Sequence, residues 1–115
     1  MGIAAELNIS INQGSTFSMT STVNDSNGDP IDLTSATISS MIRQNVGDAS
    51  PAATFDVVGT DLANGQFEIR LEPAVTAALS FSGNIAVWDL DIEYSPTEVD
   101  TVFFGRVTLN REVTR

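Results

Sequence analysis

The chain has 115 residues and a formal net charge of −10, and it contains five arginines but no lysine, histidine or cysteine. This balance excludes the cationic surface that nucleic acids and anionic membranes require of a partner. The absence of cysteine excludes disulfides and thiolate metal sites. Hydrophobic residues make up 42% of the chain, which predicts one folded domain over residues 1–115.

Apolar and polar residues alternate along the first half of the chain, which is the period of a strand with one buried face. The pattern predicts four strands, over residues 7–12, 17–23, 36–44 and 53–57. Turn residues separate these strands, as expected of an all-β protein.

The N-terminal segment, residues 1–12, has two interpretations. Its apolar residues Leu7, Ile9 and Ile11 need a sheet or a partner to cover them. The segment is either the first strand of its own domain or an arm that pairs with a neighbouring subunit. On the second interpretation these three residues are assembly contacts.

A polar turn follows the second strand, with Asp25, Asn27 and Asp29 at the spacing of the first ligands in a calcium loop. The match then fails, because Pro30 stands where that loop needs glycine and Ala36 stands where it needs a bidentate glutamate. Asx residues around a glycine are also typical of a tight turn. We therefore predict a turn and no metal.

The second half of the chain continues the strand pattern with one interruption. Residues 66–72 predict a strand that forms a hairpin with residues 53–57. Residues 73–79 begin with proline and continue with good helix formers, which predicts one or two helical turns. The spacing of Val75 and Leu79 places both on the side of that helix that faces the core. Residues 102–109 predict the last long strand.

The stretch Ile85–Tyr94 is the most regular strand in the chain. Trp88, Leu90, Ile92 and Tyr94 alternate with acidic residues, and Trp88 is the only tryptophan. A large ring carries much buried area, so this strand is predicted to lie at the centre of the core. The predicted core residues are Trp88, Leu90, Ile92, Phe67, Ile69, Val107 and Leu109.

The other face of this strand carries Asp89, Asp91 and Glu93. Neighbours two apart on a strand lie about 7 Å from each other, a separation that glycosidase carboxylates can share. Those enzymes also need a cleft and aromatic rings that stack on sugar, and the rings of this strand alternate onto the opposite face. The acidic row is therefore predicted to meet solvent or to be an assembly contact for an arginine of a neighbouring subunit.

Together these elements predict an all-β, antiparallel β-sandwich or barrel of about seven strands with one short helical connection. The chain has no His, Cys or Lys to activate a serine or threonine nucleophile, and it lacks a glycine-rich phosphate loop. We therefore predict that it is not an enzyme and takes no cofactor or small-molecule substrate. No secretory signal opens the sequence, which predicts a product made in the cytoplasm.

Several stretches, in order, carry a family resemblance. They are Gly-Asp-Pro-Ile-Asp-Leu-Thr at residues 28–34, Asn-Gly-Gln-Phe-Glu-Ile at 64–69, Val-Trp-Asp-Leu-Asp-Ile at 87–92 and Gly-Arg-Val-Thr-Leu at 105–109. This order resembles small tail-associated proteins of bacteriophages and the immunoglobulin-like N-terminal domain of phage baseplate upper proteins. The similarity extends over residues 17–115.

The resemblance implies an immunoglobulin-like sandwich that acts as a structural subunit of a phage tail, baseplate or fibre attachment. It implies a location in the virion and partners that are other virion proteins and further copies of the chain. In baseplate upper proteins a helical linker and a receptor-facing region follow this domain, whereas this sequence ends at Arg115, which implies a stand-alone subunit. The alternatives are a capsid decoration protein or a carbohydrate-binding module.

Overall fold

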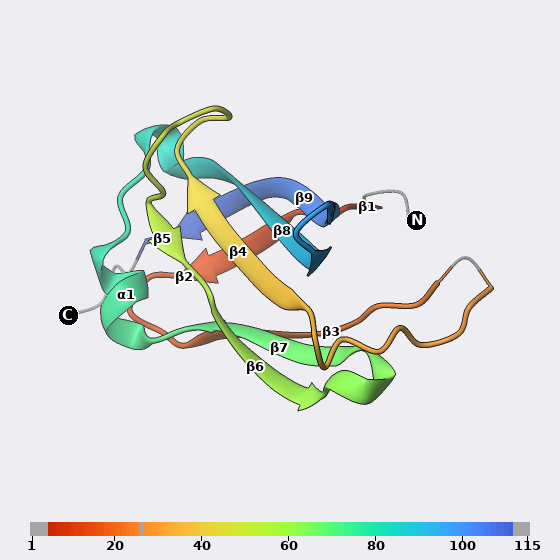
Figure 1. The fold of residues 1–115 in the computed structure, drawn as a ribbon. Coiled ribbons are helices and arrows are strands. Elements are labelled where there is room, and N and C mark those ends of the chain that lie inside the picture. Colours follow the sequence, from red (N-terminus) through yellow and green to blue (C-terminus); the bar gives the residue numbers. More distant parts are fainter. Residues whose placement is uncertain (1–4, 26, 112–115) are drawn as a thin grey trace.

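The computed structural model describes residues 5–25 and 27–111. These residues form two facing β-sheets with a short helix at one end (Figure 1). The larger sheet has the strand order β1-β9-β8-β4-β5, and β2 also pairs with β9. Its strands are β1 (Ala5–Glu6), β2 (Ile9–Asn12), β4 (Thr37–Arg43), β5 (Ala53–Thr54), β8 (Ile85–Ser95) and β9 (Glu98–Asn110).

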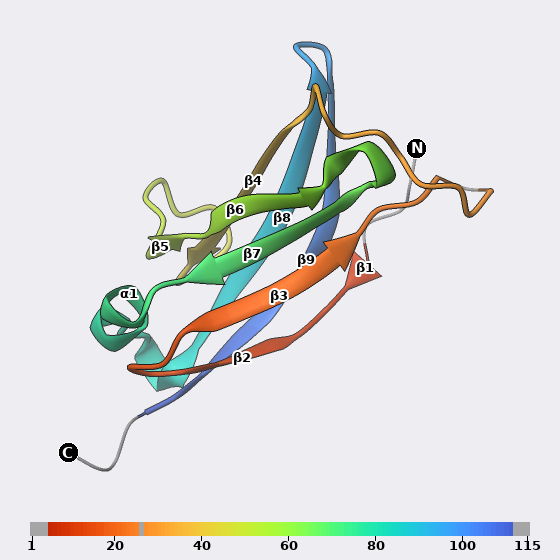
Figure 2. The same cartoon turned by 90° about the horizontal axis from the view of Figure 1, so that it is seen from below.

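The smaller sheet has the order β3-β7-β6 and is antiparallel throughout (Figure 2). Its strands are β3 (Phe17–Thr22), β6 (Asp56–Asp61) and β7 (Gln66–Leu71). A 3₁₀ turn (Leu62–Asn64) joins β6 to β7, and helix α1 (Pro73–Ala78) with a second 3₁₀ turn (Ser82–Asn84) leads back to the larger sheet. The all-β class is therefore right.

The sheets are not antiparallel throughout, because β1 and β2 run parallel to β9. The antiparallel prediction is wrong at this edge of the larger sheet. The turn after β2 contains Gly14 at a φ of 86° and carries the chain to the other sheet. β2 and β3 therefore do not form a hairpin, and β2 lies beside the last strand of the domain instead.

The predicted strand over residues 53–57 divides at Phe55. Ala53 pairs with Ile42 of the larger sheet, whereas Val57 pairs with Ile69 of the smaller one. Phe55 is buried between them, and its N–H donates a hydrogen bond to the carbonyl of Ser40 at 2.9 Å. A buried aromatic thus marks the point where the chain crosses between sheets, and the described residues form nine strands in place of about seven.

The core fills the space between the two sheets. The seven residues predicted for it are all buried, and Trp88 is only 3% exposed. β8 lies between β4 and β9 at the middle of the larger sheet, so its inward face meets residues from both layers. Tyr94, at the end of that face, is only partly buried.

Helix α1 occupies the predicted position, and Leu79 at its end is buried as predicted, but the inward placement of Val75 is wrong. Val75 is 39% exposed, and Thr76 is the buried residue of the helix. The Thr76 hydroxyl donates to the carbonyl of Ser15 at 2.7 Å and accepts a hydrogen bond from the Gly14 N–H at 3.1 Å. The turn between β2 and β3 needs a polar partner there, so a threonine faces inward and fixes the helix against the turn.

Candidate functional site

The acidic face of β8 forms the floor of the candidate site, on the side of the larger sheet that faces away from the smaller one. Asp89 lies opposite Met41 of β4 and Phe104 of β9 in the strand register. Residues directly opposite each other in an antiparallel sheet point to the same face. The register therefore brings a carboxylate, a thioether and an aromatic ring onto one outward surface.

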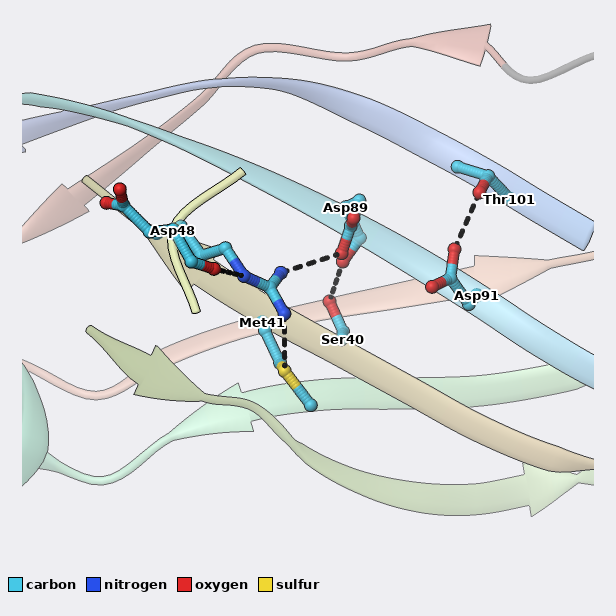
Figure 3. Close-up of polar contacts among 7 residues, drawn as sticks. Ser40, Met41, Asp48, Asp89, Asp91 and Thr101 are labelled. Atoms are coloured by element: carbon cyan, nitrogen blue, oxygen red, sulfur yellow. Dashed lines mark hydrogen bonds and ion pairs between the residues drawn. The ribbon is translucent and has the colours of Figure 1, made fainter. Parts of the chain in front are cut away.

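Asp89 is the central charged residue of this surface, and its side chain is 39% exposed. Its carboxylate lies 3.9 Å from Nη1 of Arg43, and Arg43 is itself held by the backbone carbonyl of Asp48 (3.1 Å) and the sulfur of Met41 (3.4 Å). Figure 3 shows Asp48, Met41 and Asp89 around the guanidinium group of Arg43, which makes these three contacts. A separation of 3.9 Å is long for an ion pair, so the neutralisation of Asp89 is incomplete.

Partial burial raises the pKa of Asp89, the charge of Asp91 raises it further, and Arg43 acts in the opposite direction. The direction of the net shift agrees with the long ion pair, because a closely paired aspartate has a lowered pKa. The ionised form of Asp89 is therefore less stable in the folded protein than in water, because the ion pair with Arg43 does not offset its partial burial.

The three acidic residues of β8 do not form one site. Asp91 accepts a hydrogen bond from the hydroxyl of Thr101 on β9 at 2.7 Å (Figure 3). Glu93 is exposed at the far end of the strand. The arginine expected from a neighbouring subunit has a counterpart within the chain, because Arg43 approaches Asp89 from β4. Asp89 is therefore the central residue of the site, and Asp91 is the neighbouring carboxylate whose charge acts on it.

A groove of about 550 Å³ runs over this surface. The loop between β4 and β5 forms one wall with Val46 and Asp48, and Val87 and Asp89 of β8 and Phe104 of β9 complete it. Phe104 is 43% exposed and Val46 is 87% exposed. Exposed large apolar side chains that line a concave surface beside a carboxylate are typical of a binding site for a ligand or a partner protein. We call this cleft the acidic groove.

Sequence reasoning missed the aromatic residue of the groove. The aromatic rings of β8 do face the core, but β9 supplies Phe104 on the acidic side. The signal was present in the sequence, because Phe103 and Phe104 are adjacent and a strand turns consecutive side chains to opposite faces. One of the two had to face away from the core.

The N-terminal segment belongs to the same sheet. Ile9 and Ile11 are buried in the core, so neither is an assembly contact at the surface in this structure. Leu7 is partly exposed, and its carbonyl accepts a hydrogen bond from the indole N–H of Trp88 at 2.7 Å. The segment bends over Gly105, where an added Cβ would lie 2.2 Å from that carbonyl. Residues 5–12 are thus a strand region of their own domain, and residues 1–4 of the possible arm lie outside the described part.

The calcium-like spacing serves a turn. Oδ1 of Asp25 accepts hydrogen bonds from the N–H groups of Asn27 (2.9 Å) and Asp29 (3.0 Å). A carboxylate that bonds the backbone two and four residues on stabilises a loop without an ion. Within residues 5–25 and 27–111, no group of three or more acidic side chains is placed to hold a metal.

No protein-family model matches this sequence, and a comparison with curated proteins finds no match. No helix in the described ranges is long and apolar enough to cross a membrane.

Proposed function

We propose that this chain is a non-enzymatic structural protein of a bacteriophage particle, a tail or baseplate subunit that acts by assembling with other proteins. The observation that carries the proposal is the strand order. In an immunoglobulin sandwich the second, fifth and fourth strands lie side by side in one sheet, and the third, sixth and seventh lie in the other. When β2 is counted as the first strand and β5 is set aside as an addition, β3 is the second strand, β4 is the third, and β6 to β9 are the fourth to the seventh. The orders β3-β7-β6 and β4-β8-β9 then match those of the two sheets.

The strand order supports the immunoglobulin-like fold that the sequence resemblance implies. β5 extends the larger sheet beyond β4, as the additional strand of variable-type domains does. The core differs from that of an antibody domain, because the chain has no cysteine and Trp88 lies on the sixth strand of that scheme. Trp88 stacks on Phe103 at 6.3 Å and meets Phe55 edge-on at 6.1 Å, so three rings occupy the space between the sheets.

The surface supports an assembly role over catalysis. Exposed apolar side chains occur on both sheets, with Val58 on the smaller one and Val99 and Phe104 on the larger one. β6 is an outer strand of its sheet and offers an unpaired edge to a strand of another chain. A small domain with apolar contacts in several directions is suited to a position between neighbouring subunits.

Purified particles from the phage that encodes this chain provide the test. Tails and capsids are separated on a density gradient, and the chain is quantified in each fraction by mass spectrometry against an assigned tail protein. We expect a fixed ratio to the tail protein and gold labelling of tails by an antibody against the chain. Recovery with capsids would support a decoration protein instead, and recovery only in the soluble lysate would refute a virion role.

A further inference from the structure

The acidic groove contains a charge that the protein leaves without a close partner. Among the described residues, the counter-charge of the Asp89 carboxylate is Arg43, at 3.9 Å. Ser40 bonds the backbone carbonyl of Asp89 and not its carboxylate. A partly buried carboxylate in this condition lowers the stability of the free domain, and groups of this kind concentrate at functional sites.

The position of Arg43 leaves one side of Asp89 open. Arg43 lies opposite Val87 in the strand register, so it approaches Asp89 from that end of β8. Asp91 lies two residues further along, at the other end. A cation between Asp89 and Asp91 would therefore meet two carboxylates without displacing Arg43.

The walls of the groove fit a long side chain with a charged end. Val46, Val87 and Phe104 offer apolar surface beside Asp89, and Asp91 follows two residues further along β8. The alkyl part of arginine or lysine packs on apolar surface while its head reaches a charge. A guanidinium also stacks on an aromatic ring, and Phe104 is exposed enough to accept one.

We infer that the acidic groove is a docking site for an arginine- or lysine-bearing segment of a partner protein, whose cationic head lies between Asp89 and Asp91 and whose alkyl stem lies on Phe104. The inference deepens the proposed assembly function and rests on it for the nature of the partner.

Charge complementarity favours this occupant over two others. A second copy of the chain would bring its own net charge of −10 to an already acidic face. A neutral glycan would not compensate the charge of Asp89, and Val46 and Val87 of the lining are aliphatic and offer no ring for a sugar to stack on. A basic segment relieves the carboxylate and covers the apolar walls together.

Nuclear magnetic resonance titration of the purified chain tests the inference. The probe is a blocked tripeptide with a central arginine, and its twin carries citrulline, which has the same shape without the charge. The backbone amide signals at positions 89 and 104 are followed in the wild type and in the variants Asp89→Asn and Phe104→Ser. Asp56→Asn removes the same charge from β6 of the other sheet and is the matched control.

We expect saturable shifts in the groove with the arginine peptide and binding weaker by about tenfold for citrulline and for Asp89→Asn. Phe104→Ser should also weaken binding, whereas Asp56→Asn should not. The inference is overturned by equal effects of Asp89→Asn and Asp56→Asn, by equal binding of citrulline, or by no saturable shift up to about 10 mM peptide.

A parallel titration with neutral oligosaccharides is included, and saturable shifts at Phe104 with a sugar but not with the arginine peptide would overturn the inference in favour of a glycan site. Failure of the peptide test leaves the presence of the chain in purified particles unaffected. Absence from particles would leave the peptide result standing, so the two failures are distinguishable.

Discussion

Replacing Trp88 by alanine tests whether β8 is the centre of the sandwich. The Trp88 ring is 3% exposed, contacts the rings of Phe55 and Phe103, and donates a hydrogen bond to the carbonyl of Leu7. The substitution therefore removes a ring contact to β9 and a ring contact to the segment that crosses between the sheets at Phe55, and it releases the N-terminal strand region. We expect a large loss of stability without a change of strand order.

The magnitude follows from the burial. A buried tryptophan side chain removes roughly 150–250 Å² from water, worth about 4–6 kcal/mol at about 25 cal/mol per Å². A partly compact unfolded chain reduces this by about a tenth to two-fifths, and the lost indole bond adds about 1 kcal/mol. The expected destabilisation of Trp88→Ala is about 3–5 kcal/mol, the range for large aromatic truncations.

Urea unfolding followed by far-ultraviolet circular dichroism measures this loss, because the variant has no tryptophan for fluorescence. Trp88→Phe is the companion variant, since it keeps a ring in the core and leaves the Leu7 carbonyl without its donor. We expect about 1–3 kcal/mol for that change, with faster amide exchange over residues 5–12. A loss below about 1 kcal/mol for Trp88→Ala would show that β8 does not centre the core.

Three further changes test other parts of the structure. Gly105→Ala places a Cβ 2.2 Å from the Leu7 carbonyl oxygen and should lower stability by about 1–3 kcal/mol in urea unfolding. Gly59→Ala should lower stability less, because the nearest atoms to its Cβ belong to the Leu62 side chain and not to the backbone. Thr76→Val removes the hydroxyl that bonds the β2–β3 turn and should lower stability by about 1–3 kcal/mol. Thr76→Ser keeps the hydroxyl and should lower stability by under about 1 kcal/mol, and equal losses for the two variants would contradict the role of these hydrogen bonds. Asp89→Asn should raise the melting temperature at pH 7, because burial and Asp91 raise the pKa of Asp89 in the folded state, so that ionisation of Asp89 opposes folding above pH 3.8. Scanning calorimetry should find that this gain in melting temperature falls as the pH drops towards 3.8, and a gain independent of pH would contradict the assignment.

The sequence by itself determined the all-β class, because strand periodicity and turn residues are local properties of the chain. The alternation in Ile85–Tyr94 sufficed to assign Trp88, Leu90 and Ile92 to a buried face, since a strand turns successive side chains to opposite sides. The same rule applied to Phe103 and Phe104 would have found the exposed ring of the groove. Periodicity gave less for helix α1, whose six residues are too few for a face to be read, and there Thr76 and not Val75 is buried.

The tertiary structure alone decided which strands meet. No local pattern says that residues 5–12 lie parallel to β9, because the pairing joins the two ends of the chain. The crossing between sheets at Phe55 and the bend over Gly105 likewise depend on residues distant in sequence. The acidic groove is of the same kind, since it exists only where β4, β8 and β9 bring Arg43, Asp89 and Phe104 together. Strand propensity is a property of neighbours along the chain, whereas a site requires a register between strands, and long-range packing sets that register.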